Sequence, residues 1–168
     1  MPHYRRCWVP GGTYFFTVNL LERRRRLLVE HIDDLRDAFR QAHAQRPFGL
    51  PAWVVLPDHL HCVWVLPEGD ADIATRWRHI KTLFARAQPG GEWRSCRRIA
   101  KGERGIWQRR YWERVVRDEC DLRRCIDYIH HNPVKHGLVA HVADWPHSSF
   151  HRFVRDGRLL VDWCAARS

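Results

Sequence analysis

Four runs of apolar and aromatic residues along the chain predict β-strands. The first, TYFFTVNLL, is rich in aromatic and β-branched residues and follows a turn signal of one proline and two glycines. The second and third runs are separated only by Pro57 and Asp58, which favours a hairpin or a bent pair of strands. The predicted strands lie at residues 13–21, 51–56, 60–66 and within 107–116.

Three other segments repeat apolar residues at helical spacing. They predict helices at residues 31–45, 70–87 and 118–132. In the last of these, Leu122, Ile126 and Ile129 form the apolar stripe, and Asp118 stands where it can cap the first turn. We expect this helix to stop at Asn132, because a residue that precedes proline is biased away from the helical conformation.

The order of these elements predicts an α+β fold with a ferredoxin-like βαββαβα core, in which an antiparallel sheet carries its helices on one face. A chain of 168 residues with 45% hydrophobic content fits one domain and a short tail. We place the domain at residues 1–145 and the C-terminal tail at 146–168, and the sequence leaves open whether the tail folds back over the domain or binds a partner. The basic, glycine-containing segment 88–106 is expected to be a mobile loop that contacts nucleic acid.

The charge of the chain indicates a polyanionic partner. Its formal net charge is +10, and 26 of the 29 basic residues are arginine, the side chain best suited to bidentate phosphate contacts. Several of the nine tryptophans are interleaved with arginine, as in RWRHIK and IWQRRYWER, a pattern that suits unpaired nucleotides. For any single tryptophan, a place in the core remains the alternative.

The cysteines and the apolar runs indicate in which cellular compartment the protein works. Six cysteines at positions 7, 62, 96, 120, 125 and 164 form no C-x-x-C pair, and we expect reduced thiols in a cytosolic protein. No apolar run approaches the roughly 20 residues of a membrane span, and the N-terminus lacks the apolar region of a signal peptide. We therefore expect a soluble cytoplasmic protein, associated with the nucleoid through its charge.

His59-Leu60-His61 lies at the start of the third apolar run. On a strand, residues i and i+2 point to one face, so the two imidazoles would share a face while Leu60 points into the core on the other. Two imidazoles aimed at one point can hold a divalent metal. Ordinary hydrogen-bonded histidines at a strand end are the alternative, since 12 histidines in this chain give roughly one such pair by chance.

Tyr128 and Asn132 are four residues apart on the last predicted helix and share a flank of its apolar stripe. Tyrosine is a poor nucleophile at neutral pH, but a metal that polarises a phosphodiester lowers the demand on it. The amide oxygen of Asn132 could be a third metal ligand, since Mg²⁺ and Mn²⁺ prefer oxygen and accept imidazole. Taken alone, Tyr128 is also typical of a packing residue, and Asn132-Pro133 of a helix stop.

These residues carry a resemblance to a known family. LPDHLHCVW resembles the His-hydrophobic-His element of the HUH single-tyrosine nucleases, and DYIHHNPVKHGLV resembles the tyrosine helix of the REP-associated tyrosine transposases. Further blocks, including GERGIWQRRYWERVVRDE and DWPHSSFHRFV, are similar to family blocks in the same order. The resemblance therefore covers nearly the whole chain.

The resemblance implies a ferredoxin-like catalytic domain with a Mg²⁺ or Mn²⁺ ion at His59 and His61, and with Asn132 at the place of a third polar ligand. It implies Tyr128 as the nucleophile that forms a 5′-phosphotyrosine, and single-stranded DNA folded into REP hairpins, cleaved beside a guiding tetranucleotide, as the substrate. Such enzymes work as monomers or dimers, and we favour a monomer. The chain departs from the family at Arg114 and Cys125, where histidine is common.

The sequence also offers candidate DNA contacts and competing functions. The candidate DNA-binding residues are Arg24, Arg25, Lys81, Arg109, Arg110 and His131. For the arginines and for Lys81, an ordinary solvated face is the alternative. The competing function is a non-catalytic domain that binds hairpins or single strands. A zinc hydrolase is a weaker third option, because the sequence shows no obvious third histidine or glutamate base for it.

Overall fold

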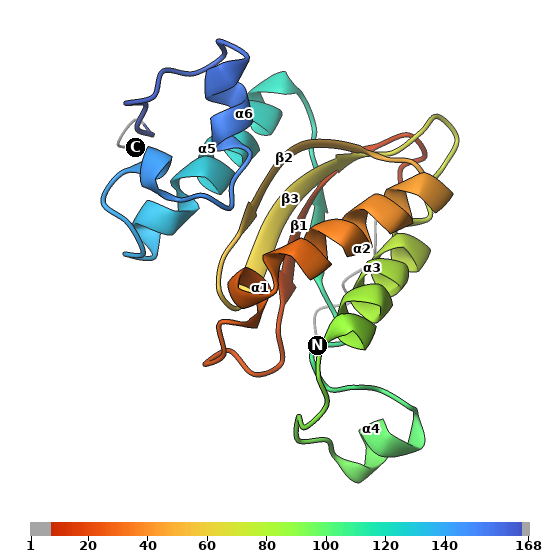
Figure 1. Cartoon of the computed structure of the whole chain (residues 1–168). Helices are drawn as coiled ribbons and strands as arrows, with labels where there is room; N and C mark the ends of the chain where they lie inside the picture. The colour runs from red at the N-terminus through yellow and green to blue at the C-terminus, as the bar shows by residue number, and fades with distance from the viewer. Residues whose placement is uncertain (1–7, 166–168) are drawn as a thin grey trace, which may run out of the picture.

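Four strands form one antiparallel sheet with the order β2-β3-β1-β4 in the computed structural model, which describes residues 8–165 (Figure 1). The strands are β1 (Thr13–Asn19), β2 (Gly49–Val55), β3 (His59–Val65) and β4 (Trp112–Val115). All three neighbouring pairs are antiparallel. This order, with helical segments between β1 and β2 and between β3 and β4, confirms the predicted ferredoxin-like α+β fold.

The helices connect and flank these strands. They are α1 (Leu27–Glu30), α2 (Ile32–Gln45), α3 (Ile73–Ala87), α4 (Cys96–Ala100), α5 (Glu119–Lys135), a 3-10 turn (Val142–Asp144) and α6 (Phe150–Arg155). Helices α2 and α3 lie side by side across one face of the sheet, as predicted (Figure 1). The short helix α4 lies inside segment 88–106, for which the sequence predicts a loop.

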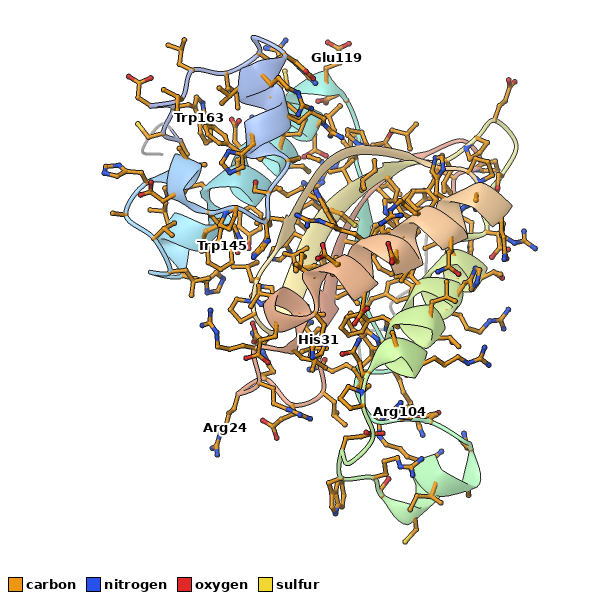
Figure 2. All side chains as sticks on the ribbon, in the orientation of Figure 1. Arg24, His31, Arg104, Glu119, Trp145 and Trp163 are labelled. Atoms are coloured by element: carbon orange, nitrogen blue, oxygen red, sulfur yellow. The ribbon has the colours of Figure 1, made fainter. Side chains whose placement is uncertain are left out.

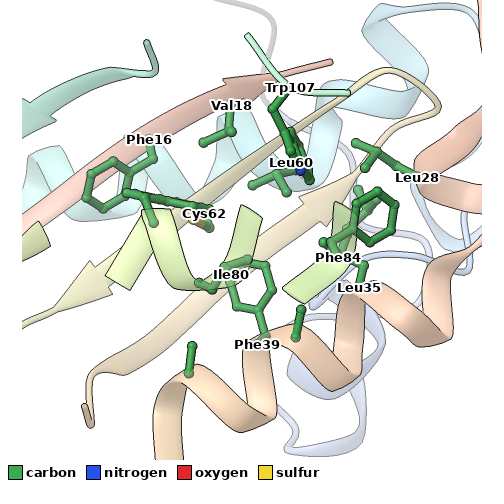
Figure 3. Packing of buried hydrophobic residues seen from close by; sticks show 14 of the residues in the cluster. Phe16, Val18, Leu28, Leu35, Phe39, Leu60, Cys62, Ile80, Phe84 and Trp107 are labelled. Carbon is green, nitrogen blue, oxygen red and sulfur yellow. The ribbon is translucent and has the colours of Figure 1, made fainter. Parts of the chain in front are cut away.

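Both faces of the sheet are apolar, and each is covered. On one face, Phe16 and Leu60 pack with Phe39 of α2 and Ile80 of α3 (Figure 3). On the other face, Phe15 of β1, Val54 of β2 and Val63 of β3 pack against Ile126 and Ile129 of α5. The expectation that helices lie on one face therefore holds for α2 and α3, whereas α5 packs on the opposite face because alternate residues of β1, β2 and β3 supply a second apolar surface.

Helix α5 ends later than its sequence predicts. Asp118 caps its first turn by accepting a hydrogen bond from the backbone N–H of Asp121 at 2.8 Å, as expected. The predicted stop at Asn132 is wrong, because the helix continues through Pro133 to Lys135. The carbonyl of Asn132 accepts from the N–H of His136 at 3.0 Å, and Gly137, with a φ of +68°, then ends the helix.

The C-terminal segment belongs to the same packed unit. The N–H of Val55 donates to His147 O, and the N–H of Ser149 donates to Trp53 O, both at 2.9 Å, so this segment lies along the free edge of β2. Phe153 of α6 is buried in the cluster beneath α5. The division expected after residue 145 therefore marks no break in packing, and the described part of the tail packs on β2 and α5.

Two further observations concern the described residues. None of their helices is long and apolar enough to cross a membrane. Their five cysteines are all free thiols, and Cys7 lies outside the described residues.

His130 is fully buried between α5 and α6, where it forms a 2.9 Å hydrogen bond with the Ser149 hydroxyl. Burial, together with the nearby Arg152 and Arg158, lowers the pKa of His130 to about 4. Between pH 6.5 and 4 the unfolded chain therefore binds a proton that the folded chain does not, so the free energy of unfolding should fall as the pH falls.

Denaturant titrations at pH 7 and pH 4.5 test this prediction with His130→Gln. The wild type should lose about 2 kcal/mol more than the variant over this range. His141→Gln, which changes an exposed histidine, is the control and should behave as the wild type does. Equal losses in the wild type and in His130→Gln would contradict the prediction.

Candidate active site

His59 and His61 lie on β3 and point to the face that α5 covers, while Leu60 between them is buried on the other face, as predicted. Both histidines are buried, and their ring centroids are 5.0 Å apart. Nδ1 of His59 donates to the Asp58 carboxylate at 2.7 Å, and Nδ1 of His61 pairs with the Thr17 hydroxyl at 2.8 Å. These contacts fix both rings and leave the Nε2 atoms available.

The surroundings keep the two imidazoles neutral. Burial lowers the pKa of His59, although the neighbouring Asp58 opposes this shift. Burial and the adjacent His59 lower the pKa of His61 to about 3. Neutral imidazoles have a free lone pair at neutral pH, which is the form that binds a metal.

Helix α5 brings Tyr128 to this pair. The Tyr128 ring lies 5.3 Å from the His61 ring and 5.9 Å from the Phe15 ring, and 39% of the residue is exposed. The buried side chains of Ile126 and Ile129 hold the neighbouring turn on the sheet. The predicted nucleophile and the predicted metal pair are therefore neighbours in one chain, with Tyr128 open to solvent on one side.

The two positions that depart from the family pattern hold this helix in place. The Arg114 guanidinium on β4 donates to both carboxylate oxygens of Asp121 on α5, at 2.7 and 2.9 Å, and to Cys125 Sγ at 3.0 Å. A bidentate pair of this kind fixes direction as well as distance. Arg114 and Cys125 thus link β4 to the first half of α5.

Two residues near the end of α5 join the site although the sequence reasoning missed them. The Lys135 ammonium lies 4.7 Å from the centre of the Tyr128 ring, and the His136 ring lies 5.2 Å from the His59 ring. They follow Tyr128 by seven and eight residues, which is two helical turns. This spacing could have placed both residues on the flank of Tyr128, but the predicted helix end at Asn132 left them outside the helix.

Asn132 lies between these contacts on the same flank of α5, four residues from both Tyr128 and His136. It is 0% exposed, and neither its amide oxygen nor its amide nitrogen has a hydrogen-bond partner among the described residues. Nε2 of His61 is likewise buried without a partner. Because buried polar atoms are costly when unpaired, the amide oxygen of Asn132 and Nε2 of His61 fit the ligands of a bound ion.

The donor set is mixed rather than a cluster of histidines. Across residues 8–165, no group of three or more His, Cys, Asp or Glu side chains is arranged to hold a metal, although His136 stands beside His59. A zinc hydrolase site of three such ligands is therefore not formed by the described residues. The candidate donors are thus two imidazoles and one amide oxygen.

The arginine run lies next to this site. Arg23 donates to Asp58 at 2.7 Å, and through Asp58 it reaches His59. Residues 23–26 line a cavity of about 370 Å³ together with His59 and His136. Arg24 and Arg25 are exposed on the loop before α1, from which the labelled Arg24 extends (Figure 2). This placement fits the predicted DNA contacts of Arg24 and Arg25.

The other candidate DNA contacts lie elsewhere. Lys81, on the α3 side of the sheet, donates to the carbonyls of Gln108 at 2.9 Å and Arg109 at 3.4 Å, and burial lowers its pKa to about 8. Arg109 and Arg110 are exposed beside β4. His131 lines a cavity of about 430 Å³ with residues 161–164. Their DNA contacts stay predictions, and the carbonyl bonds of Lys81 give it a structural role.

Comparison with known proteins shows the family. No family model matches the chain. A REP-associated tyrosine transposase of Escherichia coli (strain K12) is 48% identical over 163 residues, which are 97% of this chain and 91% of that protein. A Haemophilus influenzae (strain ATCC 51907 / DSM 11121 / KW20 / Rd) protein whose name also places it among the REP-associated tyrosine transposases is 44% identical over 168 residues, covering 97% of this chain and 93% of its own.

A solved structure agrees with these relatives. It is a REP-associated tyrosine transposase bound to a REP hairpin, and it is 46% identical to this chain with a TM-score of 0.86. The match covers 100% of this chain and 94% of the solved one. The fold, the order of the sequence blocks and these relatives agree, and the chain belongs to the family of REP-associated tyrosine transposases.

Proposed function

We propose that this chain is a metal-dependent single-stranded DNA endonuclease and strand transferase that acts on REP-type hairpins through a 5′-phosphotyrosine at Tyr128. One observation carries the proposal: the half-exposed ring of Tyr128 lies 5.3 Å from the buried, neutral His61. A nucleophile beside a pair of metal-ligand side chains is the arrangement that phosphodiester cleavage needs. The hairpin bound to the similar transposase supports the choice of substrate.

In this proposal Tyr128 of α5 carries out the cleavage and the strand transfer. The Tyr128 oxygen attacks phosphorus, its proton passes to water, and the bond from phosphorus to the 3′-oxygen breaks. The leaving 3′-oxygen takes a proton, and the 5′-phosphate remains on Tyr128. Because the ester retains the bond energy, a 3′-hydroxyl of another strand can reverse the step and join the strands without ATP.

His59, His61 and Asn132 would hold the Mg²⁺ or Mn²⁺ ion, which when bound polarises the phosphodiester and offsets its developing charge. Lys135 stands over the Tyr128 ring, where its ammonium can pair with the phosphate that Tyr128 attacks. Arg24 and Arg25 can hold neighbouring phosphates of the strand from the adjacent loop.

We further propose that one chain completes this site. Tyr128 reaches His61 of its own chain, so cleavage in cis by a monomer requires no partner, although a homodimer is compatible with the same contacts. The attraction of a chain with net charge +10 to DNA would keep such a protein at the nucleoid of the cell.

Tyr128→Phe tests the nucleophile. The variant should lose cleavage of a labelled REP hairpin in Mg²⁺ or Mn²⁺, as seen on a denaturing gel, and should keep hairpin affinity within about twofold because only a hydroxyl is removed. Tyr111→Phe is the control, since Tyr111 packs beside Trp77 on the α3 side of the sheet. A Tyr128→Phe protein that cleaves as the wild type does would refute the nuclease and favour a non-catalytic hairpin-binding domain.

The metal site has a test that does not depend on activity. Titration of the protein with Mn²⁺, followed by calorimetry or by its electron paramagnetic resonance signal, should show binding that His61→Ala abolishes. Asp58→Asn should weaken Mn²⁺ affinity by about 10- to 100-fold, because Asp58 orients and polarises His59. His131→Ala, on another flank of α5, should have no effect. Mn²⁺ affinity that is unchanged in His61→Ala would contradict the assignment.

A further inference from the structure

Trp112, at the start of β4, lies in line with the histidine pair. It pairs with Thr17 on β1, and Thr17 pairs in turn with His61 on β3. Residues in one such row share a face of the sheet, and strands are about 4.8 Å apart, so the Trp112 backbone lies roughly 10 Å from that of His61. Trp112 therefore lies on the same face of the sheet as His61 and in the same row of paired residues.

This face is open at the start of β4. Helix α5 packs mainly on β2 and β3 and reaches β4 through Arg114, whereas 49% of Trp112 remains exposed. The Trp112 ring meets the edge of Phe15 at 6.0 Å, and Phe15 also contacts Tyr128 at 5.9 Å. The indole and the proposed nucleophile thus share Phe15 as an aromatic neighbour, and the indole presents a large apolar surface to solvent.

The chain bulges next to Trp112, and this bulge contains Arg110. Gln108 donates its N–H to Asn19 O at 3.0 Å, whereas Trp112 pairs with Thr17. One residue separates Thr17 from Asn19 on β1, but residues 109, 110 and 111 separate Gln108 from Trp112, so two extra residues bulge out. Bulges beside active sites re-aim side chains.

Arg110 lies in this bulge, and its charge is unpaired among the described residues. It is exposed, and among residues 8–165 it makes no hydrogen bond or ion pair, whereas Arg109 is paired with Glu103 at 3.0 Å. Arg110 also lines a cavity of about 420 Å³ with Arg97 and Arg98. Arg110 thus offers an unpaired positive charge two residues from Trp112, which favours an anionic partner over an apolar protein segment.

We propose that Trp112 and Arg110 form a subsite for an unpaired nucleotide next to the cleaved phosphodiester. The indole stacks on the base, and the guanidinium binds a phosphate of the same strand. The inference rests on the proposed function, because it places this nucleotide beside Tyr128. It also assigns recognition of the unpaired strand to the sheet edge at β4.

The test measures binding in the absence of cleavage. In full-length Tyr128→Phe protein, affinity is compared for a REP hairpin with a four-nucleotide single-stranded extension and for the same hairpin with a blunt end. Adding Trp112→Ala should weaken binding of the extended hairpin by roughly 5- to 100-fold and leave the blunt hairpin unchanged. Trp112→Phe should restore most of the loss. Trp8→Ala, a change at a 52% exposed tryptophan that lies beside the acidic Glu68 and Asp70, is the matched control and should change neither affinity.

Two results would overturn the subsite: unchanged affinity for the extended hairpin, or an equal loss for both hairpins. Arg110→Gln should also lower the slope of log affinity against log salt by about one for the extended hairpin, and an unchanged slope would remove Arg110 from the subsite. Failure of the protein with intact Tyr128 to cleave DNA would refute the proposed function alone, because the difference between the two hairpins is measured without cleavage.

Discussion

The structure depends on the packing of α5 against the second apolar face of the sheet. Ile126 and Ile129 bury themselves on the strands, and the Arg114–Asp121 pair fixes the direction of the helix. This packing sets the position of Tyr128 relative to His61, because the tyrosine is carried to β3 by the helix. A shift of α5 by one residue would rotate Tyr128 by about 100° away from the histidines.

The site combines a neutral interior with a charged rim. Burial keeps His59 and His61 uncharged, so they can act as ligands, while Arg23 and Lys135 stand at the border where phosphates would approach. A charged imidazole pair would repel a metal ion, and an uncharged rim would not hold a polyanion. The division of charge between interior and rim thus suits a metal-assisted reaction on DNA.

Periodicity was sufficient to predict the parts of the site that lie on single elements. Alternation on a strand predicted that His59 and His61 share a face, and the four-residue spacing predicted that Tyr128 and Asn132 share a flank. Lys135 was missed because the pre-proline bias is a local tendency, and here the helical contacts around Pro133 outweigh it. The segment IWQRRYWER was predicted to suit unpaired nucleotides, but the sequence could not tell the buried Trp107 from the exposed Trp112, because that difference depends on strand register and on a bulge.

The location of the covalent bond between protein and DNA tests the central claim most directly. After reaction of the wild type with a REP hairpin in Mn²⁺, the adduct would be digested with protease and nuclease, and the modified peptide sequenced by mass spectrometry. The account predicts a nucleotide joined through its 5′-phosphate to Tyr128. A bond to any other residue, or cleavage of the hairpin without a covalent adduct, would contradict it.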